Sequence, residues 1–205
     1  QVLGHLEHAK PGAPGDVATR SALVYQWMSQ PADAITALEA GIAAEPGHTG
    51  VHDAFIELYR SEGRAAQCAS VYRRMVRTTP KEPMLLWHAG RAEAAAGDES
   101  RAASQFDIAD QHYAKAAESF GAYRAMRPDH AAATDHWRAI AKLSRARCAI
   151  ENGDPAAARR LFDEAYEITP AVADRDENGY PKVRDSFGGN YEGGLFLLGR
   201  SIAEG

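Results

Sequence analysis

The residues with the most explicit chemical spacing lie in the acidic stretch 174–185. Oxygen-bearing residues occur there at the first, third, fifth and twelfth places, and Gly179 stands at the sixth, as in a calcium-binding loop. Alternate oxygens would converge on a hard cation, and the glycine permits the sharp turn. The candidate ligands are Asp174, Asp176, Asn178 and Asp185, together with the backbone carbonyl of Tyr180. The spacing makes calcium the one cofactor that the sequence indicates.

The alternative for this stretch is an ordinary acidic loop. Its twelfth residue, Asp185, is shorter than the usual glutamate, so bidentate closure on a calcium ion is strained. Pro181 and three basic residues lie within the loop, and Pro170 ends the preceding helix early. Both interpretations stay open at the level of the sequence.

Eight histidines raise the question of a transition-metal site. His5 and His8, and likewise His48 and His52, have helical spacing, but no third ligand follows at the spacing typical of zinc. We therefore expect structural or surface roles for the histidines. The sequence also lacks a nucleophile elbow, a P-loop and a dinucleotide-binding glycine motif. No catalytic constellation can be built, and we expect a chain that is not an enzyme.

The elements that would position these groups are helices, which recur along the chain. Four stretches place a small residue, a large one four positions later, another residue three later, and a proline after five more. These stretches end at Pro46, Pro80, Pro128 and Pro170. A second helical pattern precedes each stretch and ends at a turn signal. The four turn signals are Ser29-Gln30-Pro31, Gly63, Gly97-Asp98 and Asn152-Gly153-Asp154-Pro155.

This pattern resembles the tetratricopeptide repeat family, whose unit has about 34 residues and consists of a helix pair. The units that end at Pro46 and Pro80 match best, through Tyr25, Ala34 and Leu38 in the first of them. The tryptophan that the family favours near the start of a unit is missing. The resemblance implies an all-α fold, a right-handed α-α superhelix (solenoid) of stacked antiparallel helix pairs.

The repeats are expected over residues 1–170. The expected units are about 1–14, 15–48, 49–82, 83–128 with an extended helix, and 129–170. Within the fourth unit, the sequence predicts one long helix over 99–127 or a helix broken near Gln111. An acidic, turn-rich loop is expected over 171–189, and the first helix of a truncated further repeat over 190–205. A missing repeat or a second copy of the chain would cover the apolar face of that helix.

The resemblance also implies a function. In that family the first helix of each pair lines a concave groove that holds a peptide, which implies a non-catalytic interaction scaffold with a protein or peptide partner. The groove positions in this sequence are Leu23, Gln26, Trp27, Asp53, Glu57, Arg60, Trp87, Arg91, Leu143, Arg147, Ile150 and Glu151. Trp27 and Trp87 would either anchor the partner or pack between repeats. Such arrays are often joined to enzymes, so a positioning domain of a larger enzyme and a calcium-stabilised array are the alternatives.

Composition and charge narrow the classes of partner. The chain has 205 residues and a net charge of -5, without the basic surface that nucleic acid requires. No apolar run approaches the length of a membrane span. Its 41 alanines against 17 aromatic residues favour closely packed helices. Two cysteines favour a reducing compartment such as the cytoplasm, but because the sequence begins at Gln1, a secreted or periplasmic location stays open.

Overall fold

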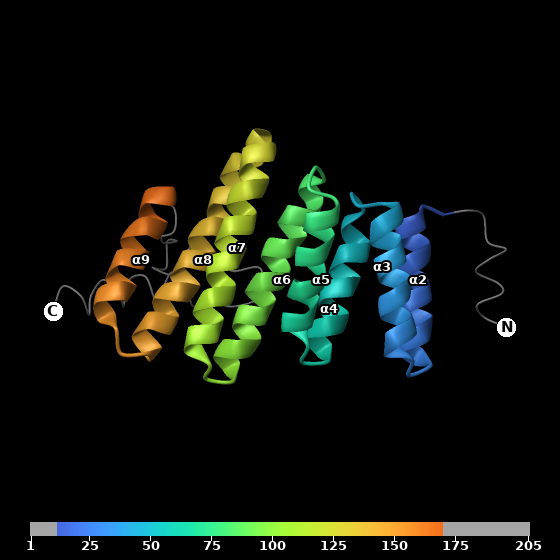
Figure 1. The fold of residues 1–205 in the computed structure, drawn as a ribbon, viewed down its shortest axis with the longest axis horizontal. Coiled ribbons are helices and arrows are strands. Elements are labelled where there is room, and N and C mark those ends of the chain that lie inside the picture. The colour runs from blue at the N-terminus through green and yellow to red at the C-terminus, as the bar shows by residue number, and fades with distance from the viewer. Residues whose placement is uncertain (1–11, 170–205) are drawn as a thin grey trace, which may run out of the picture. The chain divides into compact units, whose positions relative to one another are not determined.

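The described part of the chain folds into helices without a β-strand. The computed structural model describes residues 12–169 (Figure 1). The helices are α2 (Pro14–Trp27), α3 (Pro31–Ala44), α4 (Thr49–Ser61), α5 (Ala65–Thr78), α6 (Pro83–Ala102), α7 (Phe106–Met126), the short 3-10 helix η1 (Pro128–His130), α8 (Ala131–Glu151) and α9 (Pro155–Ile168). The expected all-α class of helical repeat is confirmed. The chain divides into two compact units, Gln1–His88 and Ala89–Gly205, which we describe separately.

The first unit packs helix pairs through the small and large positions of the repeat pattern. Helix α2 lies against α3, and α4 contacts α2, α3 and α5. Leu38, Phe55 and Tyr72 are almost completely buried. Gly41 approaches Ala18 so closely that a side chain at position 41 would collide with the Ala18 methyl group. Small residues therefore set the spacing between α2 and α3.

Each helix pair is connected by a turn that contains one residue with positive φ. These residues are Ser29, Gly63, Ser104 and Gly153, with φ values of 58°, 65°, 59° and 75°. The left-handed conformation reverses the chain within a few residues, and glycine adopts it without strain. The two serines adopt the same conformation without that advantage. Pro31 and Pro155 then begin α3 and α9, where their missing amide hydrogen is not needed.

The turn expected at Gly97-Asp98 is wrong, and so are the predicted alternatives of one long helix over 99–127 and a break near Gln111. Helix α6 continues through Gly97 to Ala102, and the reversal occurs at residues 103–105. Gly97 serves packing instead of a turn, because the buried ring of Tyr113 lies where its side chain would be. Tyr113 also donates its hydroxyl hydrogen to Asp98 Oδ1 at 2.6 Å. These contacts hold α7 against the last turns of α6.

The second unit has longer helices, and one of its buried clusters lies between α8 and α9. Ile140, Leu143, Leu161 and Phe162 form one buried cluster with several alanines. Helix α8 also packs along α7. Gly90 lies against Phe120 and Gly97 against Tyr113, which shows that α6 and α7 run antiparallel.

Three aromatic residues that the repeat pattern predicts as core, Tyr25, Phe106 and Trp137, are only half-buried. Phe106 is the first residue of α7 and packs at the edge of a small cluster. Trp137 contacts Phe120 at a ring distance of 5.8 Å, but its indole is too large to be covered completely.

Candidate functional site

The predicted groove residues of the first unit lie on the exposed sides of α2 and α4. Trp27 is 76% exposed, and Leu23, one helical turn earlier on the same face, is 47% exposed. Three further predicted residues, Asp53, Glu57 and Arg60, are exposed along α4. We call this set, together with the exposed Gln26, the α2–α4 surface. It combines a large apolar area on α2 with charged groups on α4.

The charges of the α2–α4 surface are partly neutralised. Arg60 Nη1 lies 3.4 Å from Glu57 Oε2, an ion pair between residues three apart on one helix. An exposed pair of this kind contributes little to stability. Loss of this pair on contact with a partner would therefore cost little free energy.

The remaining predicted groove residues lie on α6 and α8, and most of them are at least half-buried. Trp87 and Arg91, both on α6, are half-buried. Leu143 was predicted to line the groove, and this is wrong, because its side chain is fully buried in the cluster with Ile140 and Phe162. Helix α8 lies between α7 and α9, so a position that the repeat pattern places on a surface is covered.

The other groove residues on α8 form a charged edge. Arg147 Nε lies 3.3 Å from Glu151 Oε1, and Arg101 Nη1 lies 3.9 Å from the same oxygen. Ile150 packs partly against the buried cluster below. This edge lacks the large exposed apolar side chains found on α2.

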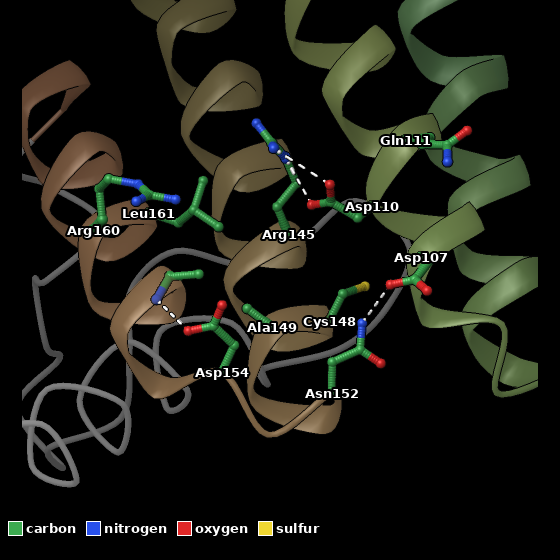
Figure 2. Close-up of a pocket in the computed structure, with 11 residues that line it drawn as sticks. Asp107, Asp110, Gln111, Arg145, Cys148, Ala149, Asn152, Asp154, Arg160 and Leu161 are labelled. Carbon is green, nitrogen blue, oxygen red and sulfur yellow. Dashed lines mark hydrogen bonds and ion pairs between the residues drawn. The ribbon is translucent and has the colours of Figure 1, made fainter.

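A cavity of about 770 Å³ lies between α7, α8 and α9, in a region that the sequence did not single out (Figure 2). At about 100° per residue, Arg145, Cys148 and Asn152 project from a side of α8 that is about 110° around the helix axis from Arg147 and Glu151. Helix α7 and the start of α9 form the walls. The lining residues are Asp107, Asp110, Gln111, Arg145, Cys148, Ala149, Asn152, Asp154, Ala157, Arg160 and Leu161. The volume lies in the range typical of sites for small molecules or single peptide segments.

Most polar groups of the cavity are held by specific contacts. Arg145 binds Asp110 in a bidentate manner, with Nε and Nη2 at 2.8 and 3.3 Å from the two carboxylate oxygens. Asn152 Nδ2 donates to Asp107 Oδ1 at 2.8 Å, and the backbone amide of Ala157 donates to Asp154 at 2.9 Å. These bonds fix the orientation of three carboxylates around the opening.

Two groups of the cavity keep capacity for a ligand. Arg160 forms no hydrogen bond or ion pair with any residue from 12 to 169, and its guanidinium is directed toward α8 (Figure 2). Asp107 and Asp154 each accept one bond through Oδ1, so their Oδ2 atoms make no hydrogen bond within the described residues. Asp107 lies on the α7 side of the cavity, whereas Asp154 and Arg160 lie on the α9 side (Figure 2).

The thiol in the cavity is not a nucleophile. Burial, together with the nearby carboxylates Asp110 and Glu151, raises the pKa of Cys148 to about 12. A thiol with this pKa is neutral near pH 7, whereas nucleophilic attack requires the thiolate. Cys148 therefore acts as a small apolar residue in the floor of the cavity.

Two histidines of the first unit, His48 and His52, form hydrogen bonds within the fold. His52 Nε2 lies 2.9 Å from the carbonyl oxygen of Pro46, and Nδ1 lies 2.8 Å from the hydroxyl of Tyr72. A carbonyl only accepts, so Nε2 carries the proton, and in the neutral ring Nδ1 accepts from Tyr72. His48 accepts from the amide of Val51 at the start of α4. Among residues 12–169, no three His, Cys, Asp or Glu side chains are arranged to hold a metal ion.

Some predictions lie outside the described residues. They are the calcium ligands Asp174, Asp176, Asn178, Tyr180 and Asp185, the loop 171–189, and the apolar helix 190–205 with its possible contact to a second copy. Across the described helices, none is long and apolar enough to cross a membrane.

The fold and these surfaces define a helical repeat protein. The family model of the tetratricopeptide repeat matches residues 108–173, from α7 to the end of α9 and slightly beyond. This match covers about a third of the chain, and it supports the resemblance to tetratricopeptide repeats in this segment. Repeats of this family generally mediate protein–protein interaction and are typically not catalytic.

The chain was also compared with curated proteins and with solved structures. No curated protein matches the sequence. A solved structure of a human IFIT1 dimer with PPP-AAAA is similar over 78% of this chain, with 20% identity and a TM-score of 0.38. The similar region covers 35% of that protein's chain, so this chain corresponds to about a third of its length.

Proposed function

We propose that this chain is a non-catalytic interaction module that binds a partner protein or peptide through the α2–α4 surface. The observation that carries the proposal is the exposure of Trp27, whose indole is 76% exposed although the chain has few large apolar residues. Tryptophan is strongly enriched among the residues that dominate binding energy at protein interfaces. The family to which the repeats belong supports the same general role.

The composition of the surface supports a partner of particular chemistry. Leu23 and Trp27 offer a continuous apolar area to a large apolar side chain. Asp53 and Glu57 on α4 add two carboxylates, against the single guanidinium of Arg60. The partner segment that fits carries an apolar anchor for α2 and a basic side chain for α4.

Site-specific cross-linking tests the proposal even while the identity of the partner is unknown. A photo-reactive amino acid replaces Trp27 in the full chain, which is expressed in its own cells, irradiated and analysed by mass spectrometry. The matched control carries the same group at Ile108, an apolar residue on α7 that is 45% exposed. We expect adducts with one or a few proteins from position 27 and not from position 108.

Competition makes the result specific. An excess of the unlabelled parent chain should abolish the adducts, whereas an excess of the Trp27→Ala chain should leave most of them. Identical adducts from both positions, or equal competition by parent and variant, would refute the proposed surface.

A further inference from the structure

The turn between α8 and α9 contains an asparagine that is followed by a glycine, Asn152-Gly153. Asparagine is one of the chemically labile side chains of proteins. Its amide is lost most readily before glycine, because glycine has no Cβ atom that would hinder its backbone nitrogen. Both residues are exposed, and among residues 12–169 no atom beyond the neighbouring residues lies within 4 Å of where a Cβ atom of Gly153 would be. Water therefore reaches this turn.

Side-chain contacts join the end of α8 to the start of α7. Asp107 is the second residue of α7, and Asn152 directly follows the last residue of α8. Further along the same two helices, Arg145 and Asp110 form their bidentate ion pair. The bond between Asn152 and Asp107 is thus the outermost of these contacts. Helix ends open locally at a smaller cost in free energy than helix interiors, so this bond opens without unfolding of the whole unit.

Two hydrogen bonds engage the groups of this turn that would have to react with each other. The Asn152 side chain donates through Nδ2 to Asp107 Oδ1 on α7 at 2.8 Å (Figure 2). The backbone nitrogen of Gly153 donates its hydrogen to the carbonyl oxygen of Ile150 at 2.9 Å. Loss of the side-chain amide requires that this nitrogen give up its proton and that Cγ of Asn152 turn toward it. Both hydrogen bonds therefore have to open first.

We propose that Asn152 is a site of spontaneous deamidation and that its hydrogen bond to Asp107 controls the rate. When this contact opens, the backbone nitrogen of Gly153 loses its proton to solvent and attacks Cγ of Asn152. The new bond from nitrogen to Cγ closes a succinimide ring, the bond from Cγ to Nδ2 breaks, and Nδ2 takes a proton from water and leaves as ammonia. Water then opens the ring at either carbonyl, which leaves an aspartate or an isoaspartate with one new carboxylate.

The product of this reaction opposes the contact that protected the amide. The group that donated to Asp107 at 2.8 Å becomes a second carboxylate, so a hydrogen bond is replaced by repulsion between like charges. The new charge also lies at the C-terminus of α8, where the helix dipole disfavours an anion. Because the ammonia is lost to solvent, the reaction does not reverse. Deamidation thus turns a transient opening between α7 and α8, at the wall of the cavity, into a lasting one.

Peptide mapping by mass spectrometry measures the rate in the full chain. The chain is incubated in mildly alkaline buffer made with oxygen-18 water, so that each deamidation incorporates oxygen from the solvent. Asp107→Ala removes the acceptor and should accelerate loss of the Asn152 amide about tenfold, the factor that a hydrogen bond to a charged group contributes. Asp107→Asn keeps a carbonyl acceptor and should stay closer to the parent rate. The matched control is Asn178-Gly179, the other such pair in the sequence, whose rate should be the same in all of these chains.

Urea unfolding of substituted chains tests the consequence of the new charge. Asn152→Asp should lower the midpoint of unfolding more than Asn152→Ala, which removes the hydrogen bond without adding a charge. In an Asp107→Asn background the loss caused by Asn152→Asp should shrink, because the facing carboxylate is gone. Equal rates at Asn152 in the parent and in Asp107→Ala, equal acceleration at Asn152 and Asn178, or an equal loss from Asn152→Asp in both backgrounds would overturn the proposal.

Discussion

Replacing Gly97 by alanine should leave the stability of the second unit unchanged or lower it, although alanine is the better helix former. A Cβ atom at position 97 would lie 2.6 Å from Cε1 of Tyr113, and 2.8 Å from two further ring atoms. The ring is 2% exposed, and its hydroxyl is bound to Asp98 at 2.6 Å, so it has little freedom to move away. The substitution therefore forces α6 and α7 apart or displaces the ring.

The magnitude follows from a comparison with Gly121. That glycine also lies within a helix, α7, but the nearest atom to its added Cβ would be Arg138 Nε at 3.8 Å, which is an ordinary contact. Both substitutions gain helix propensity, by about 1 kcal/mol. Only Gly97→Ala adds overpacking, which costs about 1–3 kcal/mol. The difference in the free energy of unfolding between the two variants therefore measures the cost of the collision, which we expect to be about 1–3 kcal/mol.

Urea unfolding followed by far-ultraviolet circular dichroism measures this difference. We expect Gly121→Ala to raise the free energy of unfolding and Gly97→Ala to leave it unchanged or lower it. In a Tyr113→Leu background the penalty of Gly97→Ala should shrink, because the ring is gone. Equal stability of the two alanine variants would refute the role of Gly97 in helix packing.

Further predictions concern hydrogen bonds, turns and a buried thiol. Tyr72→Phe removes the hydroxyl that His52 Nδ1 contacts at 2.8 Å, and should lower the free energy of unfolding by about 1–3 kcal/mol in urea titrations. Asp154→Ala removes the cap of α9 and should cost about 0.5–2 kcal/mol in thermal unfolding, whereas Asp154→Asn should cost a few tenths. Ser104→Gly should stabilise by up to about 1 kcal/mol in the same assay, since φ is 59° there. The pKa of Cys148 rises from 9.0 to about 12 on folding, so the unfolded chain loses this proton first and stability falls as the pH rises from about 9 to about 12. Cys148→Ala should reduce that slope by up to about 1.4 kcal/mol per pH unit in urea titrations across this range.

Controls distinguish these effects from a general loss of stability. Tyr166→Phe, at a tyrosine that is 44% exposed, should change stability by less than about 0.5 kcal/mol. A loss equal to that of Tyr72→Phe would contradict the assigned hydrogen bond. Equal losses in Asp154→Ala and Asp154→Asn would contradict the cap, and a destabilised Ser104→Gly chain would contradict the strain. If the pH slope is the same in the parent and in Cys148→Ala, the thiol does not titrate as the structure implies.

The repeat pattern predicts the helical class because the same contacts between small and large residues recur in each helix pair. Ala34, Leu38 and Tyr72 are buried where the spacing of small and large residues requires it. Gly97 misled the prediction because glycine serves two purposes, a left-handed turn or a close approach between helices. Only the position of the Tyr113 ring, 16 residues further along the chain, shows which purpose applies.

The surfaces were predictable to different degrees. The exposure of Trp27 and Leu23 could be predicted from their place in the unit, whereas the burial of Leu143 depends on how closely α9 covers α8. The cavity was missed, because its contacts join residues 35 and 45 positions apart, as between Asp110 and Arg145. Asp154 could be recognised in the sequence as a helix cap, but nothing local indicates that it faces a cavity.

The claim that the α2–α4 surface binds the partner is tested most directly by affinity. The protein captured at position 27 is titrated against the parent chain and against Trp27→Ala, Leu23→Ala and the control Ile108→Ala by isothermal calorimetry. Loss of an aromatic anchor of about 2 kcal/mol corresponds to about a thirtyfold weaker complex, which we predict for Trp27→Ala, with a smaller loss for Leu23→Ala and none for the control. Equal dissociation constants for the parent and Trp27→Ala would contradict the account.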